Sequence, residues 1–285
     1  MNPVVSIVGD HVLETVGPIW YFILIVLANM LLCKIAYQKK SLSLTGTAAT
    51  LFVGTSVFWN IGLSGWLILI IFFVSSTILT KVARPYAMEA SMGIQKKGGC
   101  RDHMQVFANG GPAAIAAILY GFTGDHLYLL LFGAAIAAST SDTWAGEIGI
   151  LSDKPPVSIV TFQEVEKGLS GGVTVMGTIG GFLGSLTIAV SWYALYSSTG
   201  NYDWSTDMLC IAFAGFMGCM ADSFLGATVQ GHFYDEANNQ ITEHEYRNGV
   251  RLPLCKGIAF IDNDIVNLLS NLYAMVIAYF LFAML

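Results

Sequence analysis

Two short stretches of the sequence place an aspartate beside a hydroxyl side chain at the end of a long apolar run. SDTWAG occupies residues 141–146, and ADSFLG occupies residues 221–226. Both read small residue, aspartate, hydroxyl, aromatic, apolar residue and glycine, and this echo favours an internal repeat. An ionisable side chain at the boundary of a membrane helix is costly and is a candidate for function. The candidates in and beside the two motifs are Asp142, Thr143, Glu147, Asp222 and Ser223.

The two acids of the first motif do not share one helix face. Asp142 and Glu147 are five residues apart, which is about 140° around an ideal α-helix. They can hold one cation together only if the helix unwinds, so we expect a break at about Trp144–Gly149. In the second motif Ala227 stands at the position of Glu147, so the echo is imperfect.

A basic loop and a glycine-rich loop supply complementary chemistry. The basic loop, KVARPYAMEASMGIQKKGGCR, covers residues 81–101, and the glycine-rich EKGLSGGVT covers residues 166–174. The second can present backbone N–H groups to an anion before a helix. Carboxylates suit Mg²⁺, and phosphoryl transfer needs positioning and charge neutralisation more than a covalent nucleophile. The candidates in these loops are Lys81, Arg84, Glu89, Lys97, Arg101, Gly168, Ser170, Gly171 and Gly172.

Amide side chains recur every four residues at two expected helix starts. Arg101, Gln105 and Asn109 share one helix face, and Asn263 and Asn267 begin a second stripe that reaches Asn271. These stripes are candidates for substrate binding. For Asn271 alone, a hydrogen bond between helices, at about 1 kcal/mol, is the better interpretation.

Several other functions are disfavoured. The stretch GLSGGVT lacks the Gly-Lys-Ser/Thr ending of a Walker A loop, and no HExxH motif occurs. The Asp-rich repeat typical of membrane CDP-alcohol phosphotransferases is also missing. The five cysteines have no metal-ligand or disulfide spacing. The net charge of -6 implies no nucleic-acid surface.

The elements that position these residues are membrane helices. The chain is 55% hydrophobic and only 11% charged, whereas soluble domains carry about 25% charged residues. Apolar runs predict an all-α, polytopic membrane bundle with one domain, residues 1–285. About eight spans are expected, at 19–37, 42–60, 62–80, 105–122, 126–144, 172–196, 206–227 and 263–284.

The basic residues predict the orientation of the spans. With eight spans, all thirteen Lys and Arg residues lie on one side or just inside a neighbouring helix end. Positive residues mark the cytoplasmic side, so both termini are expected outside. The loops 81–104 and 228–262 are then cytoplasmic, and the polar candidates gather at the cytoplasmic face.

Four ordered blocks carry a family resemblance. KKGGCRDHMQVFANGG (96–111), SDTWAGEIG (141–149), VEKGLSGGVTVMGTIG (165–180) and ADSFLGA (221–227) resemble the integral-membrane domain-of-unknown-function 92 family. The resemblance covers about residues 42 to 284. That family includes human transmembrane protein 19 and the plant phytyl-phosphate kinase of vitamin E synthesis. The family usually has ADTxASEIG, and here Ser141 and Gly146 are mild departures.

The resemblance implies a kinase that phosphorylates an isoprenoid monophosphate of the phytyl or geranylgeranyl type with a nucleoside triphosphate, CTP being the expected one. Asp142 and Asp222 are then assigned to Mg²⁺ together with Glu147. Arg101, Lys97 and Lys81 are assigned to the phosphates. Gln105 and Asn109 would orient the acceptor, and the 168–172 loop would cradle the triphosphate.

Two alternative functions remain open at this stage. A lipid-phosphate cytidylyltransferase would use the same site but release pyrophosphate. A transporter or flippase for a lipid phosphate or another anion is also compatible with repeats and broken helices near a polar site. Transporter sites usually lie near mid-membrane, whereas these polar residues cluster at one face, which argues for the kinase.

Overall fold

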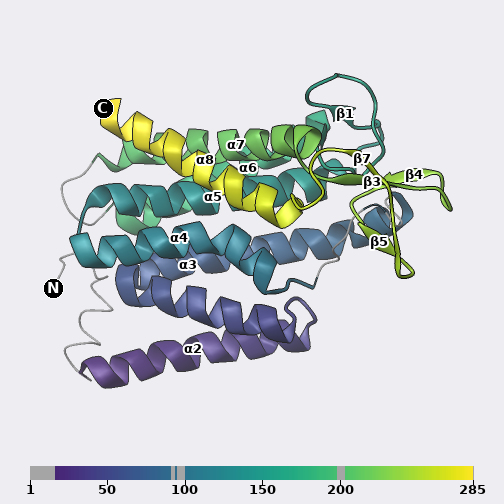
Figure 1. Ribbon diagram of the computed structural model, residues 1–285. Helices are drawn as coiled ribbons and strands as arrows, with labels where there is room; N and C mark the ends of the chain where they lie inside the picture. The colour runs from purple at the N-terminus through teal and green to yellow at the C-terminus, as the bar shows by residue number, and fades with distance from the viewer. Residues whose placement is uncertain (1–16, 91–93, 95–99, 198–202, 285) are drawn as a thin grey trace.

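Seven helices make up most of the chain in a computed structural model, which describes residues 17–90, 94, 100–197 and 203–284 (Figure 1). The predicted helical bundle is confirmed. The helices are α2 (Pro18–Gln38), α3 (Leu44–Ala90), α4 (His103–Thr123), α5 (His126–Gly149), α6 (Val175–Tyr196), α7 (Trp204–Thr228) and α8 (Asn263–Met284).

Helix α3 is broken at Gly62. Its backbone there has φ 73° and ψ -163°, a conformation that favours glycine and cannot continue a helix. The chain reverses, and the two halves of α3 lie side by side (Figure 1). The break agrees with the turn expected between the predicted spans 42–60 and 62–80.

Six of the helices are long and apolar enough to cross a membrane, with Leu44–Tyr86 counted as one. Helix α5, which carries the first acidic motif, is not among them. The start of α2 and the end of α8 lie at the same end of the bundle, opposite the long polar loops (Figure 1). The number of crossings and their orientation in the membrane stay predictions.

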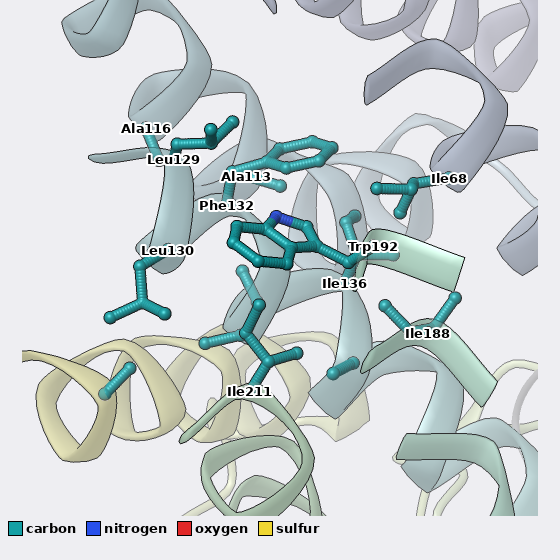
Figure 2. Packing of buried hydrophobic residues seen from close by; sticks show 14 of the residues in the cluster. Ile68, Ala113, Ala116, Leu129, Leu130, Phe132, Ile136, Ile188, Trp192 and Ile211 are labelled. Carbon is teal, nitrogen blue, oxygen red and sulfur yellow. The ribbon is translucent and has the colours of Figure 1, made fainter. Parts of the chain in front are cut away.

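The core forms around α5, which packs against α3, α4, α6, α7 and α8. Figure 2 shows the indole of Trp192 surrounded by apolar side chains from these helices. Phe132, Ile136, Ile188 and Ile211 are fully buried beside it. This packing holds the ends of α5 and α7, and therefore both acidic motifs, in fixed positions.

Glycines on α6 allow a close approach to the motif end of α5. A Cβ added at Gly177 would lie 2.7 Å from the Ala145 carbonyl oxygen, and one at Gly181 would lie 3.3 Å from that of Ser141. The Ser141 hydroxyl in turn donates to the Gly181 carbonyl at 2.7 Å. Small residues at this spacing bring membrane helices together.

A proline in α4 creates a hydrogen-bond junction between three helices. Pro112 has no N–H, so the Ala108 carbonyl lacks its intrahelical donor. The Asn271 side chain donates to that carbonyl at 3.0 Å. Ser139 donates to the Asn109 carbonyl at 2.8 Å and approaches Asn271 Oδ1 at 3.0 Å. The interpretation of Asn271 as a contact between helices is confirmed.

Short strands occur in the connections, which the all-helical prediction missed. They are two to four residues long, too short for the period-2 pattern that reveals a strand. A three-stranded sheet has the order β4-β3-β7, and two two-stranded ribbons pair β1 with β2 and β5 with β6, all antiparallel. The strands are β1 (Val157–Ser158), β2 (Gly172–Val173), β3 (His232–Asp235), β4 (Gln240–Thr242), β5 (Tyr246–Arg247), β6 (Val250–Arg251) and β7 (Leu254–Lys256).

Candidate functional site

A cavity of about 760 Å³ gathers most of the predicted site residues. Lys81 is exposed and is not part of its lining. Lys97 and the side chain of Glu89 lie outside the described part of the chain. The predicted residues that line the cavity are Arg84, Arg101, Gln105, Asn109, Asp142, Thr143, Glu147, Gly168, Ser170, Gly171, Gly172, Asp222, Ser223, Asn263 and Asn267.

The two motif aspartates meet in the cavity wall. Asp142 comes from the end of α5 and Asp222 from the end of α7, and their carboxyl groups are within hydrogen-bonding range of each other. The Ser270 hydroxyl of α8 donates to Asp222 Oδ2 at 3.0 Å. Two adjacent carboxylates repel unless a proton or a cation lies between them. The structure thus brings the two halves of the echo into direct contact.

This pair fits a hard cation. Mg²⁺ is usually held by one or two carboxylates, with waters and substrate phosphates as its other ligands. Among the described residues, no group of three or more His, Cys, Asp or Glu side chains is arranged to hold a metal. The chain therefore offers two carboxylates from two helices, which leaves room for phosphate oxygens.

Glu147 does not join the aspartate pair. Helix α5 continues to Gly149, so the break expected at Trp144–Gly149 is wrong. The helical hydrogen bonds close normally, with the N–H of Ile150 donating to the Gly146 carbonyl at 3.1 Å. Glu147 turns to another side of the helix, where Thr80 Oγ1 donates to its Oε1 at 2.6 Å. Of the three carboxylates that the sequence assigned to the metal, only those of Asp142 and Asp222 lie together.

Arg101 provides a positive charge opposite these acids. Its guanidinium carbon lies 5.5 Å from the centre of the Phe72 ring and 5.6 Å from that of Phe73, which is cation–π geometry. Burial lowers the pKa of Arg101, while the Glu147 carboxylate acts in the opposite direction. Arginine remains charged in proteins, so the cavity contains a fixed cation.

The start of α4 is set by a capping box. Asp102 Oδ1 accepts from the backbone N–H of Gln105 at 3.0 Å, and Gln105 Oε1 accepts from the N–H of Asp102 at 3.2 Å. This cap fixes where α4 begins, and it therefore sets the position of Arg101, just before the helix, relative to Asn109 within it. Gln105 therefore has a structural role besides the predicted contact with substrate.

The glycine-rich loop packs against the second motif. Gly168 has φ +89° and Gly171 has φ +87°, both in the left-handed region that favours glycine. A Cβ on Gly171 would lie only 2.4 Å from the backbone nitrogen of Ala227, at the end of α7. The Ser170 hydroxyl donates to Glu243 Oε1, which ties the loop to the segment after β4. The loop is therefore held against the last turn of α7, the helix that carries Asp222.

The structure adds site residues that the sequence analysis did not single out. Lys167 lines the cavity and donates from Nζ to the Ser152 carbonyl at 2.6 Å. Gln230 also lines it, is 1% exposed, and has no partner among the described residues for either polar atom of its side chain. Lys167 lies inside the quoted glycine-rich stretch, whereas no motif marks Gln230. The other hydroxyl, amide or carboxyl side chains added to the lining are Asn29, Thr50, Thr80, Thr174, Thr178, Glu243, Asp262 and Asp264.

The cavity continues into an apolar branch between α2, both halves of α3 and α4. Its walls contain Leu32 and Cys33 from α2, Val53 from the first half of α3, and Leu69 and Ile70 from the second half. One continuous space therefore joins a charged end to an apolar end. That combination suits a ligand with an anionic head and a hydrocarbon tail.

Comparison with known proteins places the chain among membrane proteins. It is 30% identical to protein PGR of Arabidopsis thaliana over 276 residues, 90% of this chain and 94% of that protein. An uncharacterized membrane protein of Methanocaldococcus jannaschii is 31% identical over 215 residues, 75% of this chain and 84% of that protein. The chloroplastic protein VTE6 of Arabidopsis thaliana is 30% identical over 153 residues, 52% of this chain and 46% of VTE6. No solved structure matches the chain.

The family match covers the whole candidate site. The family described as integral membrane protein DUF92 matches residues 27–275, a range that contains every residue lining the cavity. The resemblance drawn from the four sequence blocks is thereby confirmed. The chain belongs to the integral membrane protein DUF92 family.

Proposed function

We propose that this protein is a kinase that transfers a phosphoryl group from a nucleoside triphosphate to an isoprenoid monophosphate. One observation carries the proposal: a single cavity joins the Asp142–Asp222 pair, Arg101 and the glycine-rich loop to an apolar branch. The head group of a lipid phosphate belongs at the charged end, and its tail belongs in the branch. The family resemblance favours CTP as the nucleotide.

The site residues divide between the two substrates. Arg101 and the start of α4 line the same cavity as the branch, and we assign the acceptor phosphate to them. The 168–172 loop, which packs against the end of α7, and Lys167 suit the triphosphate. Gln230 can satisfy both its donor and its acceptor atoms on a nucleobase edge, whereas phosphate offers only acceptors.

Asp142 and Asp222 would hold Mg²⁺, because they are the apposed hard-oxygen donors in the cavity. When bound, the ion neutralises negative charge on the phosphates. Glu147 is better suited to orienting Arg101 and Thr80 than to binding the metal, since it accepts a hydrogen bond from Thr80 and interacts with the charge of Arg101. This replaces the predicted three-carboxylate assignment.

The transfer needs no covalent enzyme intermediate. An oxygen of the acceptor monophosphate attacks the γ-phosphorus, the bond from that phosphorus to the β-phosphate oxygen breaks, and the nucleoside diphosphate leaves. A phosphate monoester has its second pKa near 6, so the attacking oxygen is largely ionised at neutral pH and requires no general base. Arg101 and Lys167 supply the positive charge that this crowding of anions demands.

The position of the polar groups supports catalysis over transport. They lie where α5 and α7 end and α8 begins, at the loop-bearing end of the bundle (Figure 1). A transporter for an anion is expected to hold its substrate nearer the middle of its helices. The apolar branch would also suit a hydrocarbon tail better than a small anion.

The test is to incubate the purified full-length chain with isoprenoid monophosphates, Mg²⁺ and each nucleoside triphosphate, labelled either at the γ-phosphate or in the base. Transfer of the γ-label to a lipid diphosphate supports the kinase. A product carrying the base label identifies a cytidylyltransferase and contradicts the proposal. If lipid phosphate crosses the liposome membrane and no lipid diphosphate forms, the kinase proposal is contradicted and transport is favoured.

A further inference from the structure

We infer that Trp66 and Asn29 form the floor of the apolar branch, and that this floor limits the acceptor tail to about three isoprenoid units. The inference rests on the proposed function, because it takes the branch as the site of the substrate tail. It concerns the length of that tail, and it gives a tail one unit shorter than the four-unit phytyl or geranylgeranyl type that the family resemblance implies.

The lining of the branch ends part-way along every surrounding helix. The deepest lining residues are Asn29 in α2, Gly54 and Trp66 in the two halves of α3, and Gly110 in α4. Ile25, one turn deeper in α2, is buried but does not line the cavity. The branch therefore stops in the interior of the bundle rather than running through it.

The floor is held rigidly by polar and aromatic contacts. Trp66 Nε1 donates to Asn29 Oδ1 at 2.9 Å, and Asn29 Nδ2 donates to the Ile25 carbonyl at 3.0 Å. A Cβ on Gly54 would lie 2.3 Å from Asn29 Oδ1, so the amide rests directly on the glycine. Behind the floor, the Phe58 ring lies 5.2 Å from that of Trp66. A tail end that met this group would displace buried hydrogen bonds in order to pass.

The depth of the branch follows from the helix geometry. Trp144 Nε1 donates to Ser75 Oγ at 3.3 Å, so the turn of α5 that bears Asp142 is level with Ser75. Ser75 lies nine residues beyond Trp66 in the same unbroken half of α3, which is about 14 Å of helix. An extended carbon chain advances about 1.2 Å per bond, so about twelve backbone carbons, or three isoprenoid units, span this depth.

The same arithmetic relates helix turns to tail units. One turn of helix rises about 5.4 Å, and the four backbone carbons of an isoprenoid unit advance about 5 Å. Ile70 lies one turn above Trp66 and lines the branch. A bulky side chain there raises the floor by about one unit, whereas loss of the Trp66 indole lowers it.

The experiment measures kcat/KM for isoprenoid monophosphates of two to six units with the full-length chain, and separately their binding through quenching of tryptophan fluorescence. The parent is expected to prefer three units and to discriminate against longer tails by about tenfold. Ile70→Trp should shift the optimum to two units, and Trp66→Ala should shift it to four or more. Trp59→Ala is the matched control, because Trp59 is partly exposed and does not line the cavity.

The outcomes separate this inference from the proposed kinase activity. Transfer to all tail lengths alike, or optima that do not move in the correctly folded Ile70→Trp and Trp66→Ala variants, overturns the floor and leaves the kinase intact. Binding optima that move as expected without any transfer support the floor and contradict the kinase. If Trp66→Ala fails to fold, the double variant Trp66→Leu, Asn29→Leu replaces it. This variant removes both members of the hydrogen bond in the floor and should likewise shift the optimum toward longer tails.

Discussion

At the scale of single residues, the structure separates Asp142 from Glu147, although the sequence analysis assigned both carboxylates to one Mg²⁺ site. Asp142 contacts Asp222 from another helix, while Glu147, five residues later, receives a hydrogen bond from Thr80. This is the result of an α5 that stays helical, because side chains five apart point about 140° from each other. The second motif therefore contributes a partner for Asp142 rather than a duplicate site.

Gln230 offers a residue-scale prediction. Gln230→Leu keeps a side chain of similar size but removes the two polar atoms, which have no hydrogen-bond partner among the described residues. We expect the KM for the nucleotide to rise about tenfold, the cost of about one to two hydrogen bonds. The kcat and the KM for the lipid phosphate should stay near the parent values in steady-state kinetics.

The control is Gln163→Leu, which changes an exposed glutamine outside the cavity. An unchanged nucleotide KM in Gln230→Leu would remove Gln230 from the nucleotide site. A rise in the lipid KM alone would reassign it to the acceptor.

At the scale of elements, the site depends on helices that approach closely. Glycines of α6 contact the last turns of α5, and the left-handed Gly171 lies against the end of α7. Both acidic motifs are thus braced by residues without side chains. The contact between Gly171 and Ala227 could be seen only in the fold, because it joins a loop to the end of α7.

A matched pair of glycine substitutions tests this bracing. At Gly177 an added Cβ would meet the Ala145 carbonyl oxygen at 2.7 Å, whereas at Gly146 it would meet nothing within 4 Å. Gly177→Ala should lower the free energy of unfolding by about 1–3 kcal/mol, as overpacking does. Gly146→Ala should leave it unchanged or raise it by up to about 1 kcal/mol through helix propensity. Equal unfolding midpoints for the two variants would contradict the close packing.

At the scale of the whole molecule, one end of the bundle carries the chemistry and the other carries the start of α2 and the end of α8 (Figure 1). The cavity begins between the polar loops and descends among the helices. A lipid substrate can keep its tail among apolar side chains while its phosphate reaches the charged end. That this end faces the cytoplasm stays a prediction from the distribution of Lys and Arg.

Cysteine labelling in intact cells tests the orientation. Cys255 and Cys100 are exposed at the loop-bearing end, so a membrane-impermeant maleimide should label them only after permeabilisation. Thr123→Cys, at the opposite end and in a background with both cysteines changed to serine, should react in intact cells. Labelling of Cys255 from outside would reverse the predicted topology.

Much of this organisation could be predicted from the sequence. Most helix limits followed from apolar runs, but α3 continues to Ala90, ten residues beyond the predicted span 62–80 and into the predicted loop. The pairing of Asp142 with Asp222 followed from their equivalent places in two motifs. The floor at Asn29 and Trp66 could not be predicted, because it joins residues of two helices through the reversal at Gly62. Gln230 was missed for a similar reason: its importance lies in its burial beside the cavity, which no local pattern encodes.

The central claim is phosphoryl transfer at the aspartate pair, and one measurement tests it most directly. The γ-label of a nucleoside triphosphate is followed into isoprenoid diphosphate with the parent, Asp142→Asn, Asp222→Asn and the exposed control Asp153→Asn. The parent and Asp153→Asn should transfer the label, and each motif variant should lose at least about 100-fold in kcat, because a neutral amide weakens metal binding. Transfer at the parent rate by the folded double variant Asp142→Asn, Asp222→Asn would contradict the account.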